Sequence, residues 1–466
     1  MEINFSLIQK YNPWWENVLA IEQDEKIMEF KNQLFKYLPD FIQQKFAPGV
    51  YTVLGPRQVG KSTSLKLLIQ KLLLEKKVKP ENIFFFQGDI LENFKDLLDI
   101  LETYLQAMAP KNEFYIFLDE VSFIKEWPRA IKHLIDRGDF KKAIIVLSGS
   151  LSLQIKGGAE FMPGRRGKSE RKDFVQLPLD FAAYLRLRKI IWAKIDFASL
   201  LQDPAVVIKS MSLHKLYSQK SKIQRFLADY LLSGGFLLVI NEALQNKKIS
   251  DSTYSIYWDW LKGDLLKMER RENVFLEIMQ EAIKHLGSTF SYNNIAQNIS
   301  AKSHLTVIDY LDLAEKIFLL NIYPNFNLNK KLPNLRKQKK LHFLDPFLFH
   351  LLNGRLLGST QFFTTAKQAL SQKTPQLIES LVSNYLKNKF PQSGFWRNHL
   401  EVDFVGIMDN AIYGFEIKIQ EKIKSGDIQK LRELKQFKQI VMVSKNEFKL
   451  IDDILIIPYW LLLLME

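Results

Sequence analysis

The sequence predicts a multidomain α/β protein, and three observations carry this prediction. The chain has 466 residues, of which 47% are hydrophobic, enough to give roughly three domains a core each. A β-rich run followed by a glycine loop and a helical pattern begins at Tyr51, and alternating strand patterns return near residue 400. Between these regions, residues 181–285 have a mostly helical pattern.

The composition favours an anionic partner and a reducing compartment. Lys and Arg number 65 against 51 Asp and Glu, a net charge of +14 that favours a polyanion. The absence of cysteine excludes disulfides and thiolate metal sites, so we expect a cytoplasmic protein. The N-terminus lacks a secretory pattern and the apolar run ILIIPYWLLLL is shorter than the roughly 20 residues of a membrane span, so no membrane partner is expected.

The first motif is GPRQVGKST, residues 55–63. It lies between a β-rich run and an amphipathic helix, in the strand, loop and helix order that a P-loop requires. We expect its backbone to curl around phosphates, Lys61 to reach the β and γ phosphates, and the Ser62 hydroxyl to ligate Mg²⁺. The predicted ATP-binding residues are Gly55, Pro56, Arg57, Gln58, Val59, Gly60, Lys61, Ser62 and Thr63.

The second motif, EFYIFLDEVS, is an expected buried strand that ends in two acids. Asp119 is predicted to hold Mg²⁺ through water, and Glu120 to orient the attacking water. The next expected strand, KKAIIVLSGS, ends in Ser148 and Ser150. Ser150 is interpreted either as a sensor of the γ-phosphate or as a simple strand cap.

These motifs resemble a known family. GPRQVGKST, FLDEVSFIKEWPRAIKHLIDRG, VLSGSLSLQIKGGAEFMPGRRGK, QLPLDFAAYL and YLLSGGF follow, in order, the blocks of AAA-type archaeal and bacterial ATPases that carry a C-terminal domain of unknown function. The resemblance implies an AAA-type ATPase core over residues 1–190, followed by a helical lid over residues 191–285. In MPGRRGK, Arg165 and Arg166 either reach a γ-phosphate, in cis or in trans within a homo-oligomer, or form an exposed basic loop.

Residues 286–345 are predicted to form a winged helix. FSYNNIAQNISAKSHLTVIDYLDLAEKIFLLNIYP has the pattern of helix, turn, helix and strand. A cation run follows, which either grips a DNA backbone or faces solvent, and its place beside a helix-turn-helix favours DNA. The run consists of Lys330, Lys331, Arg336, Lys337, Lys339 and Lys340.

Residues 346–466 resemble the PD-(D/E)xK nuclease superfamily. A helix expected to begin at Thr374 and Pro375 precedes a strand meander, a second helix and a further strand. On this layout, carboxylates from neighbouring strands share Mg²⁺, and a carboxylate from the helix completes the metal shell. A lysine helps to position or deprotonate the attacking water. Val402 stands where the motif has proline, and ordinary strand alternation also explains Glu-Ile-Lys. The predicted metal ligands are Glu379, Asp403 and Glu416, and the predicted catalytic lysine is Lys418.

These predictions combine into one main hypothesis with two alternatives. The main hypothesis is an ATP-binding and ATP-hydrolysing protein that binds DNA and couples its nucleotide state to a metal-dependent nuclease-like domain. The first alternative is a non-cleaving ATP-dependent switch, with an inactive nuclease fold, that binds DNA or a protein partner. The second is an ATPase that remodels a protein partner. The expected cofactors are ATP and Mg²⁺, with Mn²⁺ as a substitute at the nuclease-like site.

Overall fold

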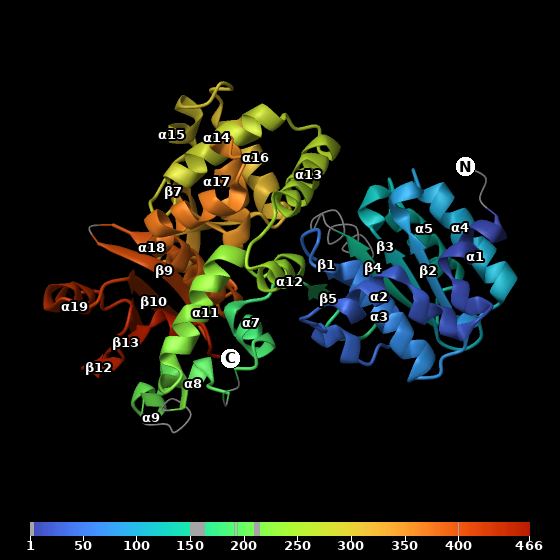
Figure 1. The fold of residues 1–466 in the computed structure, drawn as a ribbon, viewed down its shortest axis with the longest axis horizontal. Helices are drawn as coiled ribbons and strands as arrows, with labels where there is room; N and C mark the ends of the chain where they lie inside the picture. Colours follow the sequence, from blue (N-terminus) through green and yellow to red (C-terminus); the bar gives the residue numbers. More distant parts are fainter. Residues whose placement is uncertain (1–3, 150–163, 191, 193, 209–214, 399) are drawn as a thin grey trace. The chain divides into compact units, whose positions relative to one another are not determined.

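A computed structural model of the protein (Figure 1) describes residues 4–149, 164–190, 192, 194–208, 215–398 and 400–466. The chain forms two compact units, Met1–Leu177 and Pro178–Glu466. The expected end of the ATPase core at residue 190 falls inside the second unit, because Phe181 and Tyr184 pack against Tyr230 of that unit. The two units therefore divide between residues 177 and 178, and the expected end of the ATPase core at residue 190 stays a prediction.

The first unit is built on a parallel sheet. Its described strands are β1 (Gly49–Leu54), β2 (Ile83–Gln87), β3 (Phe114–Asp119), β4 (Ala143–Gly149) and β5 (Asp173–Val175). They lie in the order β2-β3-β4-β1-β5, and all neighbouring pairs are parallel. The carboxyl ends of β3, β4 and β1 therefore lie side by side at one edge, the place where α/β sheets bind ligands.

Helices and an N-terminal segment cover this sheet. Asn12 exchanges hydrogen bonds with the backbone of Phe85, and the indole N–H groups of Trp14 and Trp15 both donate to Ile83 O. These contacts cover β2, which would otherwise be an open sheet edge. The helices are α1 (Phe5–Tyr11), α2 (Glu25–Asn32), α3 (Lys61–Leu74), α4 (Phe94–Met108) and α5 (Trp127–Arg137).

The second unit is built on a mixed sheet. Its described strands are β6 (Leu320–Asn327), β7 (Leu332–Phe343), β8 (Gln392–Arg397), β9 (Glu401–Met408), β10 (Ala411–Lys418), β11 (Gln439–Ser444), β12 (Lys449–Ile451) and β13 (Ile454–Pro458). They lie in the order β12-β13-β11-β10-β9-β8-β6-β7. The strands β8, β9 and β10 form an antiparallel meander, whereas β10, β11 and β13 are parallel. The second unit therefore has β7 at one edge of its sheet.

The helices of the second unit pack on and around this sheet. None of its described helices is long and apolar enough alone to cross a membrane; α11 and α12 pass that test only together, across a bend of 115°. The helices are α7 (Phe181–Leu187), α8 (Phe197–Gln202), α9 (Pro204–Ile208), α11 (Lys220–Ser233), α12 (Leu237–Asn246), α13 (Asp251–Lys267), α14 (Glu272–Lys284), α15 (Tyr292–Gln297), α16 (His304–Lys316), α17 (Pro346–Leu356), α18 (Phe362–Lys389), α19 (Ser425–Arg432) and α20 (Tyr459–Leu462).

The expected winged helix is continuous with the C-terminal sheet. α15, α16 and β6 follow one another in the predicted order. However, β6 and β7 pair as a hairpin, and β6 also pairs with β8 in parallel at Asn325 and Phe395. The hairpin is therefore part of the eight-stranded sheet, and the expected boundary between residues 345 and 346 lies inside one compact unit. The division into lid, winged helix and nuclease-like domain stays a prediction.

The helix that carries Glu379 begins earlier than the sequence predicts. α18 starts at Phe362 and contains Pro375 in its interior, whereas Thr374 and Pro375 were expected to begin it. The Thr374 hydroxyl donates to Leu370 O at 2.6 Å, one turn earlier, which bridges the turn next to the proline. The longer helix lies against β7 and β9, and this contact brings Glu379 to the sheet.

Candidate functional site

The P-loop lies between β1 and α3, as the motif predicts. β1 ends at Leu54, Gly60 has a φ of 93°, and α3 begins at Lys61. Lys61 is only 4% exposed, and its ammonium donates to Gly55 O at 3.0 Å and to Pro56 O at 2.8 Å. Free backbone N–H groups at a helix start and a lysine beside them form an anion site, so this geometry suits the phosphates of a nucleotide.

Gln176 supports the P-loop and is not among the residues that the motifs predict. Its backbone N–H donates to Leu54 O at 2.7 Å, and its side-chain Nε2 donates to Val59 O at 2.8 Å. A Cβ on Gly55 would lie 2.0 Å from Gln176 O, so only glycine fits at that position. Gln176 follows the three-residue strand β5, and no motif marks so short a strand in the sequence.

Asp119 and Ser148 meet at the carboxyl edge of the sheet. Asp119 is 2% exposed at the end of β3, and the Ser148 hydroxyl of β4 donates to its Oδ1 atom. The backbone N–H of Glu120 donates to the same Oδ1 at 3.1 Å, with Glu120 in a left-handed conformation of φ 51°. Ser148 is thus the serine that fixes Asp119. Ser150, the predicted sensor, lies outside the described residues.

The two arginines expected at the γ-phosphate lie at the other edge of the sheet. Arg165 donates to Asp136 at 2.6 Å, and Arg166 pairs with Asp173 at 2.6 Å. A Cβ on Gly49, the first residue of β1, would lie 2.6 Å from Arg166 O. The P-loop follows the last residue of that strand, about 16 Å away at the usual rise per residue. Both arginine side chains thus pair with acids of the first unit, and their role at a γ-phosphate, in cis or in trans, stays a prediction.

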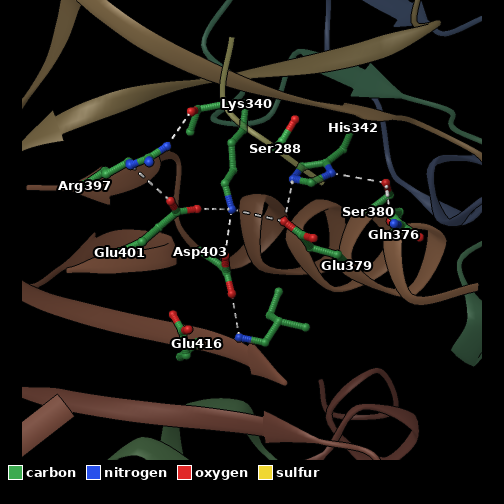
Figure 2. Close-up of polar contacts among 12 residues, drawn as sticks. Ser288, Lys340, His342, Gln376, Glu379, Ser380, Arg397, Glu401, Asp403 and Glu416 are labelled. Carbon is green, nitrogen blue, oxygen red and sulfur yellow. Dashed lines mark hydrogen bonds and ion pairs between the residues drawn. The ribbon is translucent and has the colours of Figure 1, made fainter. Parts of the chain in front are cut away.

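Three of the residues predicted for the nuclease-like site, Glu379, Asp403 and Glu416, lie near one another in the second unit, and Lys340 lies between Glu379 and Asp403 (Figure 2). Lys340 Nζ lies 2.6 Å from Asp403 Oδ1, 2.8 Å from Glu401 Oε1 and 3.2 Å from Glu379 Oε1. The lysine comes from the edge strand β7 and is 1% exposed. It was expected to belong to a DNA-gripping run, and the structure corrects this, because residues 339–343 at the end of β7 are all buried.

Glu416 and Lys418 complete this carboxylate cluster, which we define as Glu379, Glu401, Asp403 and Glu416. Lys418 Nζ lies 2.6 Å from Glu416 Oε1, and Asp403 Oδ2 accepts from the backbone N–H of Ile417 at 2.8 Å. Glu416 Oε2 is buried and has no hydrogen-bond partner among the described residues. β9 and β10 are antiparallel neighbours, which is why their side chains converge here.

The charges in the cluster are only partly balanced. Four carboxyls face three cations, Lys340, Lys418 and Arg397, the last at 3.5 Å from Glu401. Burial, and then the nearby Asp403, raises the pKa of Glu416 to about 7. Burial alone lowers the pKa of Lys340, but Asp403, Glu379 and Glu401 raise it more, so the ammonium stays charged. Burial likewise raises the pKa of Glu379 to about 7, so the charges of Glu379 and Glu416 both change near neutral pH.

The cluster does not fit a metal ion as it stands. Among the described residues, no group of three or more His, Asp or Glu side chains is arranged to hold one. Oxygens of Glu379 and Asp403, two of the predicted ligands, bind the Lys340 ammonium instead. A cavity of about 270 Å³ lies beside Glu379 and Lys418. Its lining residues are Gly287, Pro375, Gln376, Glu379, Ile417, Lys418, Ile419 and Gln420.

The cation run is only partly exposed, contrary to the prediction. Lys339, like Lys340, is buried: its ammonium donates at 2.9 Å to Leu335 O and Lys337 O and lies 4.4 Å from the centre of the Tyr292 ring. Lys331 donates to Asn410 O at 2.7 Å. The members of the run that the structure leaves exposed are Lys330, Arg336 and Lys337.

Three parts of the chain match known protein families. Residues 47–185 match an AAA domain, residues 224–358 match a domain of unknown function (DUF8612), and residues 376–462 match another domain of unknown function (DUF4143). An uncharacterized protein of Methanocaldococcus jannaschii is 22% identical over 415 residues, which are 86% of this chain and 80% of that protein. The match to an AAA domain thus covers most of the first unit and the first residues of the second, and the other two matches name no activity.

Solved structures are similar over much of the chain at low identity. A Walker-type ATPase of Pyrococcus abyssi matches with 13% identity and a TM-score of 0.40, over 71% of this chain and 94% of that one. The ORC2 protein of Aeropyrum pernix matches with 12% identity and a TM-score of 0.35, over 76% and 95%. These scores are low, so the assignment of an AAA-type P-loop ATPase core rests on the family match and on the parallel sheet.

Proposed function

We propose that the protein hydrolyses ATP in its first unit. The observation that supports this most strongly is the meeting of the P-loop, Asp119 and Ser148 at one edge of a parallel sheet. Lys61 and the first backbone N–H groups of α3 bind the β and γ phosphates. Ser62 directly and Asp119 through water would hold Mg²⁺, which supplies positive charge to the transferring phosphate.

Glu120 orients the attacking water in this proposal. It directly follows Asp119, and its left-handed backbone, rare for a non-glycine residue, is of the kind found where strain serves function. Ser148 fixes the Asp119 carboxylate by donating to it, and Gln176 holds the P-loop through Val59. Arg165 and a homo-oligomer that would place it in trans are part of the proposal as predictions only.

ATP turnover in purified full-length protein tests this proposal. Lys61→Ala is expected to lose phosphate binding and most turnover, because it removes the lysine of the P-loop. Lys76→Ala is the matched control, since Lys76 is exposed just after α3. Normal turnover in Lys61→Ala, or an equal loss in Lys76→Ala, would place the active site elsewhere.

We propose that the second unit binds DNA and, in this arrangement, does not cleave it. The exposed Lys330, Arg336 and Lys337 lie on the β6–β7 hairpin that follows α16, where they can neutralise backbone phosphates. The position of Lys340 supports the absence of cleavage, because its ammonium donates to carboxylate oxygens that would otherwise bind a catalytic metal. The order of the domains suggests that nucleotide state in the first unit controls this binding.

Metal-dependent cleavage is the second candidate, and the cavity beside Glu379 and Lys418 favours it. In this case, Lys418 serves the attacking water, so Lys418→Ala would lose cutting and keep metal affinity. Incubation with linear, branched and single-stranded DNA, with Mg²⁺ or Mn²⁺ and with or without ATP, separates the two candidates. Intact DNA under every condition supports the non-cleaving function, and products that depend on Lys418 support the nuclease.

A further inference from the structure

The Lys340 ammonium stands where a cation would sit in the carboxylate cluster. We propose that Lys340 is a built-in counter-ion that excludes divalent cations, and that removing its charge opens a site for Mg²⁺ or Mn²⁺ made by Glu379, Asp403 and Glu416. This inference rests on the proposed nuclease-like fold of the second unit. It does not depend on ATP hydrolysis.

The hydrogen bonds of Lys340 are the first support. An ammonium has three N–H donors, and here three carboxylates, Glu379, Glu401 and Asp403, lie within 3.2 Å of it. The ammonium thus donates to Glu379 and Asp403 and forms an ion pair with Glu401. A divalent cation in the same space would meet the lysine charge at contact distance, and the repulsion between two such cations is strong away from water. The lysine and the metal therefore compete for the same oxygens.

Glu416 is the second and independent support. Its residue is only 7% exposed, and its Oε2 atom is buried without a hydrogen-bond partner among the described residues. Buried carboxylate oxygens are nearly always paired, so such an atom points to a missing ligand. Once Lys340 is neutral, Glu401 still has Arg397 and Glu416 still has Lys418, whereas Glu379 and Asp403 lose the ammonium beside them. Three carboxylates at one place are the ligands that hard divalent cations prefer.

The position of Lys340 on β7 would let its ammonium move out of the carboxylate cluster when a divalent cation enters. β7 is the edge strand of the sheet, and on its outer side the backbone of Phe290 exchanges two hydrogen bonds of 2.8 Å with Lys339. The pairing with β6 is interrupted next to Lys340: Pro324 pairs with Lys339 but Asn325 pairs with Asn334, which leaves residues 335–338 as an exposed bulge. Movement of this bulge can shift Lys340 without breaking the central strands.

Mn²⁺ binding to full-length protein without nucleotide tests the inference. In Lys340→Met the side-chain shape is retained and the charge is lost, so we expect one Mn²⁺ to bind at least about tenfold more tightly than to the parent protein. Lys337→Met removes an exposed charge from the same strand and is expected to bind like the parent. Adding Glu416→Gln to Lys340→Met is expected to abolish the gained binding, which distinguishes this site from the P-loop.

Three results would overturn the inference. The first is a folded Lys340→Met protein that binds Mn²⁺ no better than Lys337→Met, and the second is tight binding at the cluster in the parent protein. If Lys340→Met is unfolded without metal, refolding on addition of Mn²⁺ supports the inference. The third overturning result is a protein that stays unfolded with Mn²⁺. Loss of ATP turnover in Lys61→Ala bears on the proposed ATPase and leaves these outcomes unchanged.

Discussion

Two buried lysines, Lys61 in the first unit and Lys340 in the second, show how neighbours decide what a lysine does. Lys61 donates to the backbone carbonyls of Gly55 and Pro56, which have no formal charge and which a phosphate can replace. Lys340 donates to carboxylates, and its charge is used inside the protein. The first lysine is thus prepared for an anionic ligand, whereas the second already has one.

The largest expected effect is on stability, and it separates the two lysines. Lys340→Ala leaves three carboxylates buried without their ammonium, which we expect to cost about 3 to 5 kcal/mol of unfolding free energy. Lys61→Ala removes bonds to neutral carbonyls and is expected to cost about 1 kcal/mol. Urea unfolding at neutral pH measures both. Equal losses in the two variants would contradict the comparison.

A second prediction concerns chemistry at the first site. Glu120→Gln is expected to keep ATP binding and to lower turnover by about 10²- to 10³-fold, because the amide cannot orient and accept from the attacking water as a carboxylate does. Nucleotide binding by fluorescence and turnover by phosphate release measure the two quantities separately. A matched change in the second unit, Glu416→Gln, should leave turnover at the parental value. If Glu120→Gln turned over normally, another residue would have to activate the water.

A third prediction concerns Asp345, a buried carboxylate of the second unit that accepts hydrogen bonds from the backbone rather than from a lysine. Burial raises the pKa of Asp345 to about 7, although the N–H groups of Gly235 and Phe347 donate to it at 2.7 and 2.8 Å. Because this pKa lies above the unfolded value near 4, the folded state binds an extra proton between these pH values. Its contribution to stability is therefore present at low pH and is lost as pH rises toward 7.

Asp345→Asn removes this titration and keeps an oxygen that accepts a hydrogen bond. We expect the fall in unfolding free energy between pH 5 and pH 8 to be smaller in the variant by about 2 kcal/mol. Urea unfolding of both proteins at the two pH values provides the comparison, and contributions from Glu379 and Glu416 cancel because both proteins contain them. An identical fall in the two proteins would mean that Asp345 titrates normally.

The sequence motifs predicted the local parts of the sites, but they did not predict the long-range strand pairing that completes these sites. GPRQVGKST predicts the strand, loop and helix that the structure has, because that motif is a continuous local unit. The gathering of Asp403 and Glu416 follows from neighbouring strands. Gln176 was missed because β5 is short, and Lys340 was misplaced because its inward direction depends on β6 pairing with β8 far along the chain. Side-chain alternation gives two faces, but only tertiary pairing decides which face is buried.

The smallest expected effect concerns DNA and the remaining members of the cation run. Arg336 and Lys337 are exposed, so replacing each with alanine should weaken DNA binding alike for all sequences and lower the salt slope by up to about 0.9 per lost phosphate contact. Lys339 is the matched control: its ammonium is bonded to Leu335 O and Lys337 O, so Lys339→Met should leave the slope unchanged. Anisotropy of a labelled duplex across a salt series measures the slope. A slope that falls with Lys339→Met but not with Arg336→Ala would mean that the buried lysine leaves its carbonyls to reach DNA, and it would contradict the prediction that the exposed cations make the phosphate contacts.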